Sequence, residues 1–216
     1  MSHIKTKDIV MGKIKSALGT ATSLPVSMPD FEAQILQPFQ DEDLTFTFAN
    51  NFKATKGQFF YCVDEQEFID ELAKLFLSKH IKKAFVWDDK LIPFFNQLHF
   101  PISTTDEDFI NCDLGITSCE ALIARTGSLM ISSNTASGRR LSVYPPVHVV
   151  VAYTSQIVPE IKDGFDTIKQ KFGHLSPSLI SMITGPSRTA DIEKTLVLGA
   201  HGPKELILFL IDDTLQ

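Results

Sequence analysis

A dense group of polar residues follows the apolar run at residues 179–183, and its composition favours binding of a small anion. The group consists of Ser187, Arg188, Thr189, Asp191 and Glu193, with His201 in the loop after it. Arginine offers five fixed donors, and the glycines beside His201 would let the backbone approach a ligand closely. A helix cap is the alternative: one hydroxyl would accept a backbone N–H and the two acids would occupy the first turn. A cap requires neither the arginine nor the histidine, so we expect a ligand.

A second candidate loop covers residues 133–140 and carries Asn134, Arg139 and Arg140 among small hydroxyl residues. Backbone amides, hydroxyls and a bidentate arginine together suit a carboxylate or a phosphate. A solvated surface loop is the alternative interpretation, since most loops are polar and exposed.

His148 is a third candidate, at the start of a β-branched run. Strand alternation places its ring on the face opposite Val147 and Val149. A histidine inside a strand is more often a hydrogen-bonded core residue than a ligand or a base. His201 is therefore the stronger candidate for a group that titrates in function.

The stretch at 185–203 reads GPSRTADIEKTLVLGAHGP and resembles the LUD-domain family. The resemblance extends over roughly residues 60–212 and includes DLGIT at 113–117, ARTGSL at 124–129 and PPVH at 145–148. It adds Thr126 to the candidate ligand-binding residues. One departure is Arg125-Thr126-Gly127, because the family usually has Glu-Thr-Gly there.

The resemblance implies a fold similar to ribose-5-phosphate isomerase, glucosamine-6-phosphate deaminase and the CoA transferases. It also implies a non-redox component of a cytoplasmic iron–sulfur L-lactate oxidation system, which binds a small anion or a partner subunit. The iron–sulfur clusters would then belong to partner proteins, because the three cysteines, Cys62, Cys112 and Cys119, form no Cys-x-x-Cys pair. We expect this chain to bind no metal or cofactor itself.

Composition excludes several classes of protein. The chain has 216 residues, 44% of them hydrophobic, which is enough for a substantial core. The net charge of −6 and the lack of a basic cluster disfavour a nucleic-acid partner. Its apolar runs are far shorter than the ~20 residues that a membrane span needs. Without an apolar leader at its start, the sequence predicts a cytoplasmic protein.

Short apolar strands alternate with amphipathic helices, which predicts an α/β fold with a mainly parallel sheet flanked by helices. The predicted strands are 45–48, 58–63, 84–87, 113–117, 129–132, 147–152 and two buried ones at 179–183 and 206–211. The predicted helices are 4–18, 65–79, 91–98 and 164–172. The last of these helices is expected to be a crossover within the parallel sheet. Residues 1–30 are predicted to form a helix and linker arm, and 31–216 a single domain. Such an arm can pack on a second copy, which allows a homo-oligomer.

No serine-hydrolase elbow, P-loop, dinucleotide-binding glycine pattern or zinc-protease motif occurs in the chain. No catalytic residue is therefore assigned, and enzymatic activity is left undecided. The alternative to the lactate role is a stand-alone enzyme that acts on a phosphorylated sugar, a CoA thioester or a similar anion. Its acid and base groups would come from Asp191, Glu193 and His201.

Overall fold

The computed structural model describes residues 6–19, 39, 43–96, 100, 102–105, 107, 109–134, 139–189, 197–199 and 201–214. The chain divides into two compact units, Met1–Pro38 and Phe39–Gln216. The first contains helix α1 (Thr6–Leu18), none of whose residues is buried. The predicted boundary near residue 30 lies outside the described residues.

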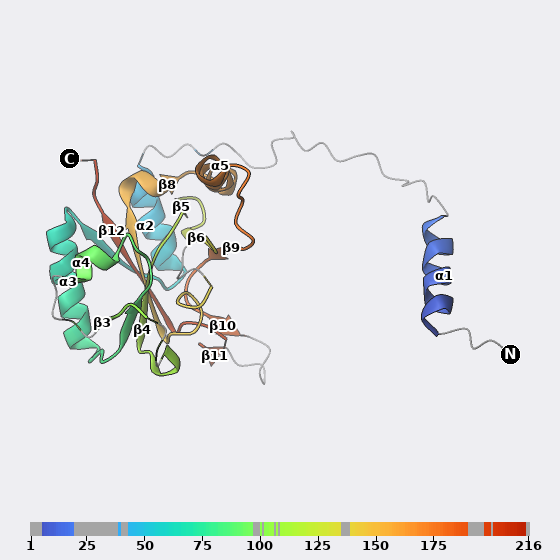
Figure 1. Ribbon diagram of the computed structural model, residues 1–216. Helices are drawn as coiled ribbons and strands as arrows, with labels where there is room; N and C mark the ends of the chain where they lie inside the picture. The colour runs from blue at the N-terminus through green and yellow to red at the C-terminus, as the bar shows by residue number, and fades with distance from the viewer. Residues whose placement is uncertain are drawn as a thin grey trace. The chain divides into compact units, whose positions relative to one another are not determined.

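A six-stranded parallel sheet is the centre of the second unit (Figure 1). Its strands, in spatial order, are β1 (Gln58–Cys62), β12 (Glu205–Ile211), β7 (Val147–Tyr153), β4 (Leu114–Ser118), β2 (Ala84–Val86) and β3 (Ile102–Ser103). The middle strands are mostly apolar and are buried along almost their whole length, as strands covered on both faces are. The predicted α/β class with a mainly parallel sheet is confirmed. The more specific likeness to the isomerase and transferase superfamily stays a prediction.

Helices α3 (Glu65–Ser78) and α4 (Ile92–Asn96) cover one face of this sheet. Asp64 caps α3 by accepting the N–H of Glu67 at 2.8 Å, and acids occupy the first turn. Phe68, Leu72 and Phe76 recur on one side of α3 and are buried against Val149 and Phe209 of the sheet. The short 3-10 helix η1 (Phe109–Asn111) precedes β4.

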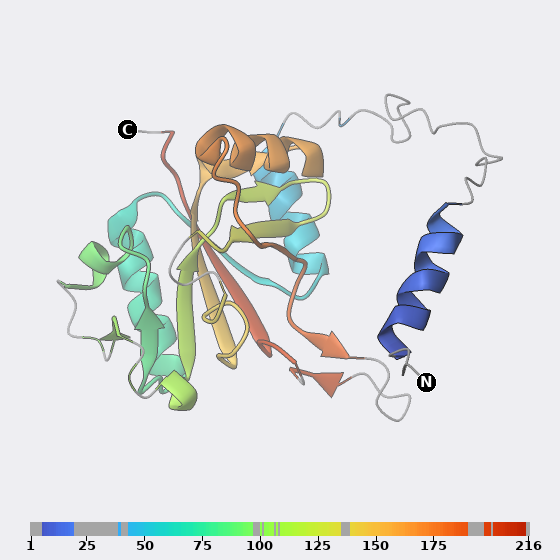
Figure 2. The same ribbon diagram turned by 45° about the vertical axis from the view of Figure 1, so that its right-hand side comes forward.

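The opposite face is covered by a second, four-stranded sheet and by helix α2 (Leu44–Ala54). The strands of the second sheet, in spatial order, are β8 (Ile157–Val158), β5 (Ala121–Ile123), β6 (Ser128–Ser132) and β9 (Ile180–Ile183). Only β5 and β8 run parallel. Helix α5 (Ile161–Phe172), after the 3-10 helix η2 (Thr154–Gln156), packs on the outer face of the second sheet (Figure 2).

Two sequence predictions are wrong in this region. Residues 45–48 belong to helix α2, because Asp43 caps it by accepting the N–H of Phe46 at 2.9 Å. Phe48 and Phe52, four residues apart, are then both buried. Helix α5 is not a crossover of the parallel sheet, because it leads to β9, which pairs antiparallel with β6. Strand β9 is also half exposed rather than buried.

The polar loop after β9 begins with a short antiparallel pair and not with a helix. Strand β10 (Arg188–Thr189) pairs with β11 (Val197–Leu198). The N–H of Gly199 donates to the carbonyl of Ser187 at 2.9 Å, which extends the pairing. Ser187 is therefore not a helix cap, whereas the helix that Thr189 would cap falls on residues 190–196, which lie outside the described part of the chain.

A tight turn at residues 124–127 is packed directly against α2. The side-chain nitrogen Nδ2 of Asn51 donates to the carbonyl oxygens of Ala124 at 2.8 Å and Arg125 at 3.1 Å. Gly127 has a φ of 59° and lies against the α2 backbone at Asn51 and Phe52. The turn therefore joins the second sheet to α2 through the side chain of Asn51 and through close main-chain packing at Gly127.

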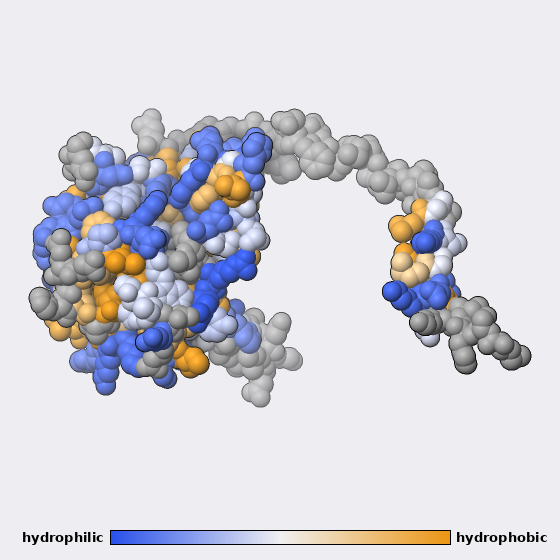
Figure 3. Space-filling model, viewed as in Figure 1, coloured by the Kyte–Doolittle hydropathy of each residue, from blue (hydrophilic) through white to orange (hydrophobic). Residues whose placement is uncertain are grey.

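The visible face of the Phe39–Gln216 unit is mostly hydrophilic, with small scattered hydrophobic areas (Figure 3). The large apolar side chains of the sheets are inside, where Phe48, Phe52, Phe68 and Phe209 are fully buried. None of the described helices is long and apolar enough to cross a membrane.

Candidate functional site

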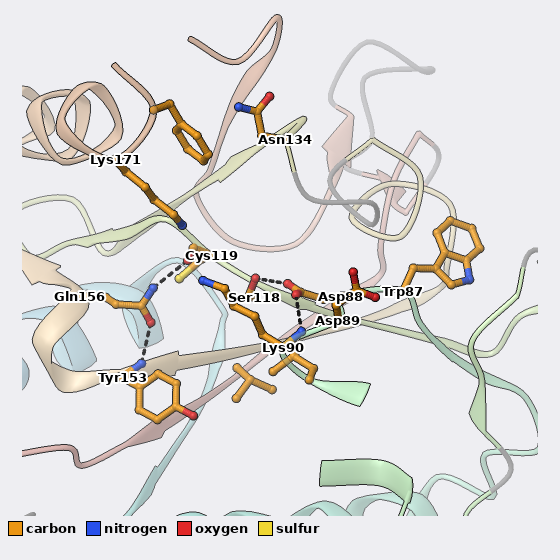
Figure 4. Close-up of a pocket in the computed structure, with 13 residues that line it drawn as sticks. Trp87, Asp88, Asp89, Lys90, Ser118, Cys119, Asn134, Tyr153, Gln156 and Lys171 are labelled. Carbon is orange, nitrogen blue, oxygen red and sulfur yellow. Dashed lines mark hydrogen bonds between the residues drawn. The ribbon is translucent and has the colours of Figure 1, made fainter. Parts of the chain in front are cut away.

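A cavity of about 510 Å³ lies at the carboxyl ends of β2, β4 and β7, which are neighbours in the parallel sheet. We call it the carboxyl-edge pocket. It is lined by Trp87, Asp88, Asp89, Lys90, Leu91, Ser118, Cys119, Asn134, Val151, Tyr153, Gln156, Lys171 and Phe172 (Figure 4). Open α/β sheets generally bind ligands beyond the carboxyl ends of their strands, so the place itself suggests a binding site.

Asp88 is the buried acid of this pocket, with 5% of its surface exposed. The hydroxyl of Ser118 donates to one carboxylate oxygen, and the N–H of Lys90 donates to the other at 3.1 Å. The carbonyl of Asp88 accepts the N–H of Leu91 at 2.9 Å, which fixes the turn after β2. A buried carboxylate held in this way is a positioned hydrogen-bond acceptor.

Lysines supply the positive charge of the pocket. Figure 4 shows the side chains of Lys90 and Lys171 extending from opposite sides toward the space beside Ser118. Lys171, in the last turn of α5, pairs with Glu120, whose side chain is only 2% exposed. Glu120 in turn accepts the hydroxyl of Ser132 at 2.6 Å. The ammonium of Lys171 is thus held at the pocket by a buried carboxylate.

Gln156 shapes the wall of the pocket without offering its own amide to a ligand. Its nitrogen donates to the carbonyl of Cys119 at 2.7 Å, and its oxygen accepts the N–H of Tyr153 at 2.8 Å. Burial raises the pKa of the Cys119 thiol, so this cysteine stays protonated and is not a nucleophile at neutral pH.

Together these groups can bind a small molecule that carries a carboxylate beside a hydroxyl. The ammonium groups suit the carboxylate, and Asp88 with Ser118 suits the hydroxyl. Within the described residues, no three His, Cys, Asp or Glu side chains are grouped closely enough to hold a metal ion.

Three of the residues predicted from sequence meet at a different cavity, of about 330 Å³, at the amino ends of β7 and β12. His148, Ser187 and His201 line it, and we call it the amino-end pocket. His148 is the second residue of β7, whereas Val151 and Tyr153 of the same strand line the carboxyl-edge pocket. These positions are three and five residues further along, so roughly 10–16 Å of strand separates His148 from them.

Other predicted residues lie outside the amino-end pocket. Arg188 is exposed, and its guanidinium donates to the carbonyl of Thr184 at 3.4 Å. Thr189 is in β10, while Asp191 and Glu193 lie outside the described residues.

The 133–140 loop is divided between three places. Asn134 lines the carboxyl-edge pocket and donates to the carbonyl of Leu175 at 3.3 Å. Arg139 donates to the hydroxyl of Ser178 at 2.5 Å. The guanidinium of Arg140 lies over the rings of Trp87 and Phe109, 5.1 and 4.7 Å from their centres. This favours a cation–π interaction with the two aromatic side chains.

The Arg125-Thr126-Gly127 turn contributes no lining residue to either pocket. Arg125 makes an ion pair of 2.5 Å with Glu160, so the basic residue has its own acidic partner here. The hydroxyl of Thr126 is buried without a hydrogen-bond partner among the described residues. The ligand-binding assignment of Thr126 remains a prediction.

Sequence reasoning did not select Asp88, Lys90, Ser118 or Lys171. A usable signal existed for the first three, because each lies within three residues of the carboxyl end of a predicted strand, where ligand-binding residues of parallel sheets are found. Lys171 gave no such signal, since its place at the pocket depends on how α5 packs on the second sheet.

His148 is fully buried, and its Nε2 is 2.9 Å from the hydroxyl of Thr117 on β4. Its Nδ1 has no hydrogen-bond partner in the described structure. Burial lowers the pKa of His148 to about 3, so the imidazole is neutral at physiological pH.

The buried neutral state of His148 predicts loss of stability in mild acid. The unfolded chain binds a proton at His148 below its ordinary pKa of 6.5, whereas the folded protein does so only below about 3. Stability therefore falls as pH decreases through this window, by about 2 kcal/mol between pH 6.5 and 5 from this residue. The free energy of unfolding, measured with urea at pH 6.5 and at pH 5, should differ less in His148→Gln than in the parent protein.

The exposed His174 provides the control. His174→Gln should keep the pH difference of the parent protein. The same pH difference in His148→Gln and His174→Gln would contradict this account of His148.

Comparison with known proteins adds to this geometry. The model of a family described as LUD domain matches residues 87–211. An uncharacterized protein of Neisseria meningitidis serogroup B is 40% identical over 105 residues, which cover 49% of this chain and 45% of that protein. Lactate utilization protein C of Bacillus subtilis is 38% identical over 103 residues, or 47% of this chain and 43% of that protein. The matched segments thus span about half the length of these curated relatives, or slightly less.

A crystal structure of a DUF162 family protein from Deinococcus radiodurans has a similar fold. It superimposes with a TM-score of 0.59 at 17% sequence identity and covers 78% of this chain and 96% of that one. At this identity the likeness concerns the fold alone.

Proposed function

Because the chain belongs to the LUD-domain family, we propose that it acts in lactate utilisation and binds a small 2-hydroxycarboxylate in the carboxyl-edge pocket. In this proposal it is a non-redox component of an L-lactate oxidation system whose iron–sulfur clusters are held by partner proteins. The relatives named lactate utilization protein C support the biological role.

One observation carries the choice of ligand. The same pocket presents two ammonium groups and a buried carboxylate bonded to a serine hydroxyl. L-Lactate has a carboxylate that requires a cation and an adjacent hydroxyl that can donate to Asp88. A plain monocarboxylate such as propionate would use only the first of these features, so the pocket should distinguish the two.

The cysteines support the assignment of redox cofactors to other chains. Burial raises the pKa of Cys62 to about 12, and burial also raises the pKa values of Cys112 and Cys119. Cluster ligands are grouped cysteines, and these three cysteines are not grouped. This favours a protein that works beside an electron-transfer chain and does not itself carry electrons.

Calorimetric titration of the purified chain with L-lactate and with propionate tests the ligand. We expect L-lactate to bind with a Kd in the millimolar range and propionate about tenfold more weakly. Lys90→Met and Asp88→Asn should each weaken lactate binding by about tenfold or more. Lys162→Met, at an exposed lysine on α5, should leave it unchanged.

Two results would reject the proposed ligand: equal affinity for the two acids, or undiminished lactate binding in both pocket variants.

The non-redox role has its own test. The purified chain should be colourless, should not oxidise lactate alone, and should recover cysteine-rich proteins from extract of its native cells. Lactate oxidation by the isolated chain would contradict the non-redox role.

A further inference from the structure

We propose that the amino-end pocket is a second ligand site, which takes an uncharged molecule that joins a hydroxyl-bearing sugar to a flat aromatic ring system, the chemistry of a nucleoside. This site is independent of the proposed lactate site, because its lining shares no residue with the carboxyl-edge pocket.

The amino-end pocket is assembled from segments that are distant in sequence. The start of β7 supplies His148, the end of β9 and the turn after it supply Thr184 and Ser187, and the turn before β12 supplies His201. The backbone fixes this arrangement, since the N–H of Ser187 donates to the carbonyl of Pro203 at 2.9 Å. The cavity is therefore part of the fold and does not depend on one mobile side chain.

His148 is the observation that points to a ligand. It lines the pocket, is 0% exposed, and has a ring nitrogen, Nδ1, with no partner in the described structure. Buried polar atoms are nearly always hydrogen-bonded, so this nitrogen requires an explanation. A ligand group that enters the pocket and reaches His148 would supply the missing bond.

The charges around the pocket favour an uncharged ligand. Among its described lining residues, the two histidines are the only titratable groups, and neither a lysine nor an arginine is present. The nearby Arg188 directs its guanidinium to the carbonyl of Thr184. A small anion would be desolvated there without a fixed counter-charge, in contrast to the carboxyl-edge pocket.

Hydroxyl groups suit His148 better than other partners. The Thr117 hydroxyl at Nε2 can donate or accept, so it fixes neither tautomer of His148. A ligand hydroxyl can likewise donate or accept, and it can therefore pair with Nδ1 in either case. The apolar walls, Pro186, Pro203 and Leu206, provide surfaces against which a ring can pack.

NMR of the full chain labelled with ¹⁵N-histidine tests the proposal, with adenosine and AMP as probes. Adenosine at about 5 mM should shift the ring-nitrogen resonances of His148, while L-lactate should not. AMP has the same ring and sugar but adds a phosphate, and we expect it to bind about tenfold more weakly. Unchanged His148 resonances with adenosine would overturn the proposal, as would tighter binding of AMP.

A variant that fills the cavity provides a second test. Ser187→Met places a larger side chain in the pocket wall and should weaken adenosine binding by about tenfold or more. Ser176→Met, at an exposed position after α5, is the matched control and should bind as the parent does. Equal adenosine affinity in these two variants would also overturn the proposal. Lactate binding should survive in both, so failure of this site is distinguishable from failure of the lactate site.

Discussion

Replacing Gly127 with alanine is expected to cost about 4 kcal/mol or more of unfolding free energy, which is exceptional for the addition of one methyl group. A Cβ at this position would lie 2.3 Å from the backbone nitrogen of Phe52 and 2.4 Å from the carbonyl carbon of Asn51. Both atoms belong to helix α2, which cannot move away without breaking the Asn51 hydrogen bonds to the turn.

Gly173 is the matched control for this substitution. Its φ of 54° is close to the 59° of Gly127, but a Cβ there would meet no atom within 4 Å. Gly173→Ala, at a φ of 54° and a ψ of −123°, should therefore cost only the strain of a backbone conformation that favours glycine, about 1–3 kcal/mol. Urea unfolding of the two variants measures the difference, and failure of Gly127→Ala to fold counts as a larger loss. Similar stabilities would show that α2 can yield to the extra methyl group.

Lys171→Met should cause the second-largest loss, about 2–3 kcal/mol at neutral pH. It leaves the carboxylate of Glu120 buried, with Ser132 as its remaining side-chain donor. Removal of one partner from a fully buried pair costs about 3–5 kcal/mol. The estimate is lower here because the Lys171 side chain is 42% exposed and its charge is partly screened by solvent.

Lys169→Met, at an exposed lysine on the same helix, is the control and should change stability by less than about 0.5 kcal/mol. Adding Glu120→Gln to Lys171→Met should restore part of the loss, because no unpaired buried charge then remains. Chemical denaturation of the single and double variants measures this coupling. A double variant less stable than Lys171→Met would refute the explanation by an uncompensated charge.

The elements predicted correctly are those in which local and long-range preferences agree. Helix α3 has a capping Asp64, acids in its first turn and apolar residues at helical spacing. Strand β7 is a mainly β-branched run that is buried on both faces, as a central parallel strand is. In each case the tertiary packing stabilises the same helix or strand that the local sequence favours.

Residues 45–48 show where such reasoning fails. The alternation Thr-Phe-Thr-Phe is typical of a strand over four residues, but the cap at Asp43 and the four-residue spacing of Phe48 and Phe52 extend further and favour a helix. A pattern of four residues was too short to decide between the two-residue period of a strand and the 3.6-residue period of a helix.

The candidate site was harder to predict than the fold. Asp88, Ser118 and Lys171 are on β2, β4 and α5 or directly after them, and only the order of strands in the sheet brings them together. That order depends on which strands pair across long stretches of chain, and one sequence does not show it. The richest polar motif, at 185–203, in fact contributes to a pocket at the other end of the strands.

The position of β12 has a consequence for how the protein is made. It follows every other strand of the six-stranded sheet in sequence, yet it lies between β1 and β7. During synthesis, β1 leaves the ribosome early, but its neighbour in the sheet is β12, which pairs with it only after residues near Ile211 have emerged. The backbone of β1 stays unpaired for that interval, and closing so long a loop is slow. The interval before β12 arrives is therefore when the nascent chain most needs a chaperone.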